Sequence, residues 1–240
     1  MYIRSYSIDP FTGHKNGRRM RIYLLGAANP ETIRMIRAVQ CTTPEAEFLG
    51  FLDNDPKKKN GYFHGLPILG GIERVEELAG ADVGFVNLIT GSTTARYETS
   101  RAIVAAGGRL TNFIHPSIDL DMTRLGVGLY LQESVILQAG VEIGDNTSIH
   151  MGALIAHESV VGSSVFIAHA VSVSGCCSIG DGTFIGTNAT ILPRISIGKW
   201  ATIGAGTVVT KDVLDFEVVV GNPGRVIKSN EALLPSGSMK

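Results

Sequence analysis

The sequence predicts a chain of two parts, an α/β domain with a small parallel sheet followed by a parallel β-helix of hexapeptide repeats. The first observation is an alternation of short apolar runs with helix-like segments between Arg21 and Gly108. The second is a branched aliphatic side chain at every sixth position from Leu125 to Val209, without an exception. A period of six residues is neither helical nor a simple strand alternation, but it is typical of a hexapeptide β-helix.

The α/β part begins after residues 1–20, which show no periodicity and form a predicted N-terminal extension. The apolar run RIYLLGA at residues 21–27 predicts a first strand. Asn29 then predicts a helix cap, with Pro30 at the first helical position, where its missing N–H costs nothing. The remaining predicted elements are a second strand at 47–53, a third strand at 84–90 and a second helix at 93–108.

These elements predict a Rossmann-like domain of the nucleotide-binding type over residues 21–114. Strands that alternate with helices form parallel sheets, whose ligands bind beyond the carboxyl ends of the strands. Gly26 follows the first strand, and Asp53 with its neighbour Asn54 ends the second. We expect these three residues at the substrate site, with Asp53 at the nucleotide or its ribose. The alternative for Asp53 is an ordinary surface turn.

The β-helix is predicted over residues 115–228, and residues 229–240 form a predicted C-terminal tail. Three hexads close one triangular coil of about 18 residues, with the aliphatic side chains pointing inward in columns. Each coil is covered only by its neighbours, so a run of coils is needed for stability. The period alone does not give the handedness of the coil, because parallel crossovers are normally right-handed.

Several phrases resemble the hexapeptide-repeat acyltransferases, namely IGDNTSI, IGDGTFIG, IGKWATIGAGTVVTKDV and VVVGNPGRVIK. The order of FLDND, GLPILGG, FIHPS and the repeats resembles the sialic-acid and amino-sugar acetyltransferase family, whose members acetylate nucleotide-linked 4-amino sugars such as bacillosamine and perosamine precursors. The resemblance covers roughly residues 21–228. It implies a left-handed coil, acetyl-CoA as co-substrate and a homotrimer with sites between subunits.

The resemblance also implies roles for individual residues. His157 matches the general base, within the phrase Ile155–Ala156–His157–Glu158, and Glu158 matches the acidic neighbour that orients it. Gly175, eighteen residues after His157, matches the glycine whose N–H binds the thioester carbonyl oxygen. The implied coenzyme-binding residues are Gly175, Thr187, Ala205, Gly206, Gly221, Asn222, Pro223 and Arg225.

The sequence departs from the family pattern at two places. The loop Gly26–Pro30 stands where relatives often have a Gly-x-x-Gly-His-Gly type sequence, so the nucleotide contact is weaker or differently made. Phe166 stands where some relatives have a second histidine, and His169 lies three residues later.

The composition excludes several classes of function. Hydrophobic residues make up 44% and the net charge is −1, which gives no sign of nucleic-acid binding. No apolar run reaches the roughly 18 residues of a membrane span, and the polar N-terminus lacks the apolar core of a signal peptide. The three cysteines, Cys41, Cys176 and Cys177, have no metal-ligand spacing and argue against a disulfide framework. We therefore expect a cytoplasmic protein.

We predict an acetyl-CoA-dependent N-acetyltransferase that acts on the amino group of a nucleoside-diphosphate sugar, the 4-amino group in particular, by direct transfer with His157 as general base. Imidazole suits the removal of an amine proton near neutral pH, and a fixed N–H stabilises the oxyanion. O-acetylation of a sialic acid or another sugar hydroxyl stays open, as does a non-catalytic protein that binds sugar nucleotides. We expect no metal, because His150, His157 and His169 lack the close spacing of zinc ligands, and we expect Cys176 and Cys177 to be small wall residues.

Overall fold

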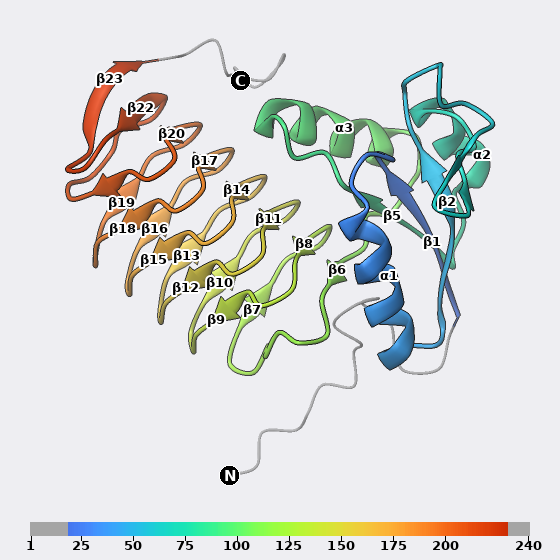
Figure 1. The fold of residues 1–240 in the computed structure, drawn as a ribbon, viewed down its shortest axis with the longest axis horizontal. Helices are drawn as coiled ribbons and strands as arrows, with labels where there is room; N and C mark the ends of the chain where they lie inside the picture. The colour runs from blue at the N-terminus through green and yellow to red at the C-terminus, as the bar shows by residue number, and fades with distance from the viewer. Residues whose placement is uncertain (1–18, 230–240) are drawn as a thin grey trace.

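The computed structural model describes residues 19–229. Residues 1–18 of the predicted extension and residues 230–240 of the predicted tail lie outside the described residues. A small α/β unit is followed by a triangular coil that extends away from it (Figure 1). Among the helices of residues 19–229, none is long and apolar enough to cross a membrane.

The sheet of the α/β unit has three parallel strands in the order β2-β1-β5. The strands are β1 (Met20–Leu25), β2 (Ala46–Leu52) and β5 (Val83–Asn87), and the two long helices are α1 (Glu31–Thr42) and α3 (Thr93–Ala105). All five predicted elements are therefore confirmed. Helix α1 begins one residue later than predicted, because Pro30 is its N-cap, although the Asn29 side chain does accept a hydrogen bond from the Glu31 N–H at 2.9 Å.

The two faces of the sheet are covered by different helices. Met35, Ile36 and Val39 of α1 pack on one face, whereas Ile103 of α3 and Val75 pack on the other. Val75 belongs to a short segment that the sequence did not predict, made of a hairpin of β3 (Tyr62–Phe63) and β4 (Leu66–Pro67), the 3₁₀ turn η1 (Ile72–Arg74) and α2 (Val75–Leu78). This segment lacks an apolar period long enough to be recognised from the sequence.

The coil has three walls of parallel strands. The first wall contains β6 (Phe113–Ile114), β8 (Tyr130–Leu131), β11 (Ser148–Ile149), β14 (Phe166–Ile167), β17 (Phe184–Ile185), β20 (Thr202–Ile203) and β22 (Glu217–Val220), to which β23 (Arg225–Ser229) pairs antiparallel. The second wall contains β9 (Ile136–Leu137), β12 (Leu154–Ile155), β15 (Ser172–Val173), β18 (Thr190–Ile191) and β21 (Val208–Val209). The third wall contains β7 (Arg124–Leu125), β10 (Glu142–Ile143), β13 (Val160–Val161), β16 (Ser178–Ile179) and β19 (Ser196–Ile197).

The predicted column of aliphatic side chains forms the core of this coil. Every member from Leu131 to Val209 is buried, and only Leu125 in the first coil is half-buried. Residues eighteen apart pair directly, as Ile155 does with Val173. The predicted β-helix of hexapeptide repeats is therefore confirmed, and a residue's corner follows from its place in the repeat.

The α/β unit and the coil share a buried junction around Arg96 of α3, whose side chain is fully buried. Its guanidinium donates to the carbonyl oxygens of Asn87 at 2.7 Å, Asn146 at 2.6 Å and Gly128 at 3.3 Å. Burial lowers the pKa of Arg96 to about 9, since no carboxylate accompanies it. Tyr130 of the first wall also packs into the core of the α/β unit. The two parts are thus joined by packing and by hydrogen bonds.

Candidate active site

The turn between the second and third walls contains His157 and Glu158, with Gly175 and Cys176 beside them in the next coil. We call these four residues the histidine corner. The coil fixes their backbone, because the Cys176 N–H donates to the His157 carbonyl at 2.9 Å. The His157 N–H in turn donates to the Gln138 side chain at 2.9 Å. The side chains of His157 and Glu158 stand on this frame and remain 57% and 72% exposed.

The two ring nitrogens of His157 face different groups. Nδ1 lies 3.2 Å from Glu158 Oε2, so the carboxylate can accept a hydrogen bond from it. Nε2 faces Gly175, because a Cβ built on that glycine would lie only 2.6 Å from it. Any side chain at position 175 would therefore collide with the imidazole. Glu158 can hold the proton on Nδ1, which leaves Nε2 free to accept one beside Gly175.

Gly175 offers a free backbone donor at this place. Its N–H has no acceptor among residues 19–229, while its carbonyl accepts from the Arg194 N–H at 3.1 Å. A fixed N–H that is not engaged within the protein can stabilise an oxyanion without reorganisation. The structure thus brings His157, Glu158 and Gly175 into one constellation suited to acyl transfer.

Cys176 joins this constellation, which the sequence analysis missed. Its Sγ lies 3.8 Å from Glu158 Oε2. Cys177 is buried, as expected for a wall residue, and burial raises the pKa of its thiol. The same expectation is wrong for Cys176, which is exposed. The eighteen-residue offset between Glu158 and Cys176 places both at one corner and could have revealed the contact.

Four of the other predicted coenzyme-binding residues, Thr187, Ala205, Gly206 and Gly221, lie at a different corner, between the first and second walls, which we call the threonine corner. The Gly206 N–H, next to Ala205, donates to the Thr187 carbonyl at 2.8 Å, and the Gly221 N–H donates to Thr207 Oγ1 at 3.2 Å. These residues form one line along the coil, and Asn222 follows Gly221. The second wall separates this line from the histidine corner, so one chain does not bring the two corners together.

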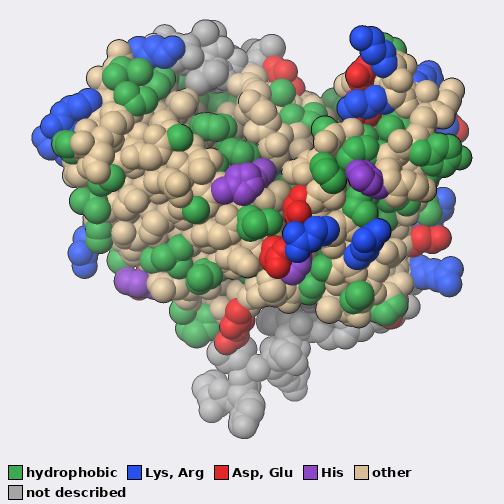
Figure 2. Space-filling view, in the orientation of Figure 1, with side chains coloured by type: hydrophobic (Ala, Val, Ile, Leu, Met, Phe, Trp, Pro, Cys, Tyr) green, Lys and Arg blue, Asp and Glu red, His purple; other side chains and the backbone are tan. Residues whose placement is uncertain are grey.

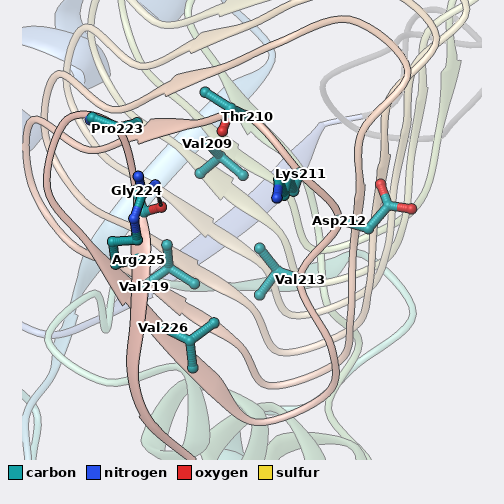
Figure 3. Close-up of a pocket in the computed structure, with 10 residues that line it drawn as sticks. All are labelled: Val209, Thr210, Lys211, Asp212, Val213, Val219, Pro223, Gly224, Arg225 and Val226. Carbon is teal, nitrogen blue, oxygen red and sulfur yellow. Dashed lines mark hydrogen bonds between the residues drawn. The ribbon is translucent and has the colours of Figure 1, made fainter.

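A cavity of about 370 Å³ lies at the far end of the coil, lined by Lys211, Pro223 and Arg225. Lys211 lies at the same corner as His157, three coils further on. Figure 3 shows Lys211 and Arg225 on two sides of this cavity with valine side chains between them, whereas Asp212 points away. Arg194, Lys211 and Arg225 form no ion pair within the described part of the chain. Lysine and arginine side chains also gather at this end of the coil in Figure 2.

Asp53 lies at the carboxyl ends of the strands, close to the loop after β1. Its Oδ2 accepts from the Ala27 N–H at 2.9 Å and from Lys58 Nζ at 2.7 Å, and Oδ1 accepts from the Asp55 N–H at 3.0 Å. Burial raises the pKa of Asp53, but these hydrogen bonds and the charge of Lys58 outweigh burial and hold the pKa below its ordinary value. Asp53 is therefore not part of an ordinary surface turn, because both oxygens of its carboxylate accept hydrogen bonds within the protein.

The other rim residues have distinct roles. Gly26 has a φ of +107°, which favours glycine. Asn54 is exposed, and its Oδ1 accepts from the Ile72 N–H at 2.9 Å. Lys58, which reads from sequence as part of a solvated loop, lies against Asp53 and also donates to the Ala27 carbonyl at 3.0 Å. The structure therefore brings Gly26, Asp53 and Lys58 together. The Asn54 side chain instead binds the backbone of Ile72.

His150 differs from the corner-facing surface residue that its sequence context suggests. It is 5% exposed, with its ring 4.7 Å from Phe166 and 4.9 Å from His169. Nε2 lies 3.1 Å from Ser148 Oγ, and Nδ1 has no partner within residues 19–229. Burial lowers the pKa of His150 to about 3, with smaller contributions from His169 and Arg96, so the ring is neutral. His169 itself is exposed.

Known proteins share the repeat and the fold. Residues 176–211 match the family model of the bacterial transferase hexapeptide, with six repeats. No curated protein sequence matches the chain at a significant level.

Solved structures match almost the whole chain. PerB from Caulobacter crescentus in complex with CoA and GDP-perosamine is 25% identical, with a TM-score of 0.76 over 89% of this chain and 98% of that one. A histidine-to-asparagine variant of perosamine N-acetyltransferase from the same organism, also with CoA and GDP-perosamine, is 24% identical with a TM-score of 0.77 over the same shares, 89% and 98%.

The acetyltransferase domain of PglB from Neisseria gonorrhoeae FA1090, in complex with acetyl coenzyme A, is 22% identical with a TM-score of 0.76, over 88% of this chain and 100% of that one. The resemblance predicted from the sequence is therefore confirmed: the coil carries the bacterial transferase hexapeptide, and the chain has the two-part, left-handed β-helix fold of the amino-sugar N-acetyltransferases.

Proposed function

We propose that this protein is an acetyl-CoA-dependent N-acetyltransferase that acylates the amino group of a nucleotide-linked sugar, the 4-amino group in particular. The observation that carries the proposal is the packing of Gly175 against Nε2 of His157, with Glu158 on Nδ1. The likeness to PerB, solved with CoA and GDP-perosamine, supports the classes of donor and acceptor.

The reaction follows from the histidine corner. The acceptor amine attacks the thioester carbonyl carbon while His157 Nε2 takes a proton from the amine. The Gly175 N–H stabilises the oxyanion of the tetrahedral intermediate. Collapse of the intermediate breaks the carbon–sulfur bond, and the imidazolium returns the proton to the departing CoA thiolate. No covalent enzyme intermediate is needed, because the thioester is already activated.

The positively charged end of the coil supports a site for the phosphates of the coenzyme. Beyond Gly175, the next turns on the same edge of the coil contain Arg194 and then Lys211. Lys211 and Arg225 line the cavity at the end of the coil. Guanidinium and ammonium groups without carboxylate partners suit the phosphates of CoA. We place the adenosine phosphates at this end, so that the pantetheine arm runs back toward His157.

The separation of the two corners supports a homotrimer. Thr187, Ala205, Gly206 and Gly221 lie across the second wall from His157 and Gly175 within one chain. They can line the same coenzyme only if the threonine corner of one copy faces the histidine corner of another. A monomer by light scattering at assay concentration would contradict this shared site.

The acceptor nucleotide is assigned to the carboxyl ends of β1 and β2. Gly26 and Asp53 lie there, and Lys58 adds an ammonium group to which a diphosphate can bind. Asp53 positions the Gly26–Ala27 loop and Lys58 through its hydrogen bonds. The Asn54 side chain accepts a hydrogen bond from the Ile72 N–H, so Asn54 holds the loop in place and does not contact the nucleotide.

The test is release of CoA thiol from acetyl-CoA in the presence of single acceptors. The panel pairs guanosine-, uridine- and thymidine-linked 4-amino sugars with the matching 4-hydroxy sugars, and mass spectrometry identifies the product. We expect turnover with an amino sugar and none with its hydroxyl analogue. Turnover with hydroxyl acceptors alone would show an O-acetyltransferase, and no turnover with either class would contradict the proposal.

A further inference from the structure

We propose that the histidine corner also binds a soft divalent cation of the zinc class, through His157 Nδ1, Glu158 Oε2 and Cys176 Sγ, and that the bound ion inhibits the protein. The ligand atoms of these residues all lie within 4.8 Å of one another. Binding of the ion is independent of the proposed function, whereas inhibition rests on the proposed role of His157 as the base.

Two of the ligand-to-ligand distances are near those around a tetrahedral ion. Zinc bonds of about 2.1 Å to nitrogen and oxygen and about 2.3 Å to sulfur keep neighbouring ligand atoms about 3.4–3.6 Å apart. The observed separations are 3.2 Å between His157 Nδ1 and Glu158 Oε2, and 3.8 Å between Glu158 Oε2 and Cys176 Sγ. Small side-chain rotations complete the set, and water can take the fourth position.

The backbone of the coil fixes the three ligands relative to one another. Glu158 and Cys176 adopt φ values of +57° and +59° at matching positions of successive coils. The His157 carbonyl accepts from the Cys176 N–H at 2.9 Å, which joins the two turns. An ion therefore meets a site whose backbone is already formed, and only side-chain freedom is lost on binding.

Metal binding at Nδ1 would disable the base by changing the tautomer of His157. In the metal-free corner, Glu158 can hold the proton on Nδ1, which leaves Nε2 free to accept the amine proton. An ion on Nδ1 displaces that proton, so the neutral ring must carry its proton on Nε2. The Cys176 thiol loses its proton to solvent when the thiolate binds the ion. The nitrogen beside Gly175 then donates a hydrogen bond and cannot take a proton.

The site is tested without any turnover by thiol alkylation, with Cys41 as an internal control. Cys41 is also exposed, and it belongs to no candidate metal cluster in the described chain. Zinc should slow iodoacetamide modification of Cys176 by about tenfold or more, because a metal-bound thiolate is a poorer nucleophile. Modification of Cys41, read from its own peptide by mass spectrometry, should be unchanged. Equal rates for Cys176 with and without zinc would overturn the site.

Cobalt(II) tests the ligand set, and activity tests the consequence. The wild-type protein with cobalt should show thiolate-to-metal charge-transfer absorption, which Cys176→Ser should lose while Cys41→Ser keeps it. Micromolar zinc should inhibit wild type and Cys41→Ser at least about tenfold more strongly than Cys176→Ser, each measured relative to its own activity without metal. Cysteine protection without inhibition would overturn the inhibitory role and count against His157 as the base, while leaving the ion site in place. A protein that turns over no acceptor can still pass the alkylation test, which separates this inference from the proposed function.

Discussion

The coil and the α/β unit position their functional groups in different ways. In the coil, the backbone ladder decides which residues meet, so Cys176 lies beside Glu158 because one coil separates them. In the α/β unit, individual side-chain contacts decide, as when Lys58 reaches Asp53 and the Ala27 carbonyl. A substitution at a corner should therefore change chemistry and leave geometry intact, whereas a substitution at the rim should change the geometry of a whole loop.

The largest effect should come from His157→Ala, which tests whether a corner substitution is purely chemical. The side chain is exposed and lies outside the inward column, so the thermal midpoint should stay within a few degrees of wild type. We expect kcat to fall by about 10²–10⁴, the range for loss of a general base, with little change in the KM for acetyl-CoA. His64→Ala, an exposed histidine outside the coil, is the control and should be active. Nearly normal kcat in folded His157→Ala would remove His157 from the mechanism.

Gly175→Ala should have the next largest effect, because the new Cβ would lie 2.6 Å from His157 Nε2. The imidazole must move, and the N–H donor is crowded, so kcat should fall by about 10²–10³, as when an oxyanion donor is removed. Gly152→Ala makes a useful comparison, since nothing lies within 4 Å of its added Cβ although its φ is +73°. That control should lose about 1 kcal/mol of stability and keep its kcat. Equal kcat in both variants would contradict the close role of Gly175.

His150→Phe tests a position where the coil and the α/β unit meet. The pKa of His150 is about 3 in the folded state and near 6.5 when unfolded, so the unfolded chain binds more protons between these values. The contribution of His150 to the free energy of unfolding is fully present above pH 6.5 and is lost as the pH drops toward 3. His150→Phe should flatten this decline, by on the order of 2 kcal/mol near pH 4.5, since one pH unit corresponds to about 1.4 kcal/mol. Denaturant titrations at pH 7.5 and 4.5 measure this difference, with His157→Ala, an exposed histidine at a different corner, as the control.

The smallest effect should come from Asp53→Asn, which tests whether a substitution at the rim of the α/β unit changes the geometry of a loop. The carboxylate would no longer hold Lys58 by charge, and the Gly26–Ala27 loop would lose a strong acceptor. We expect the acceptor KM to rise by about tenfold, with the acetyl-CoA KM unchanged, since the proposed coenzyme site lies in the coil. Asp82→Asn, which removes an exposed ion pair with Arg21, should change neither constant. An unchanged acceptor KM for Asp53→Asn would place the nucleotide away from this rim.

The sequence predicted the coil better than the α/β unit, for a physical reason. A strict six-residue repeat leaves one way to stack the aliphatic column, and the place of His157 beside Gly175 follows from the same spacing. The repeat also shows that Thr187 is not a whole number of coils from His157, so their separation could have been foreseen. The burial of His150 could not, because it depends on how Tyr130 and Phe166 pack around it. The pairing of Lys58 with Asp53 depends likewise on the path of a loop that has no period.

The buried guanidinium of Arg96 has a consequence for how the two substrates meet. Domains joined in one chain commonly move as rigid bodies about a flexible linker. Arg96 and Asn87 both belong to the α/β unit, so a bending motion would pull the guanidinium away from the carbonyl oxygens of Gly128 and Asn146 in the coil and would leave it buried with fewer acceptors. Arg96 therefore opposes hinge closure between the two parts. For the proposed donor and acceptor sites this predicts a nearly constant separation, which would favour sugars of a matching length.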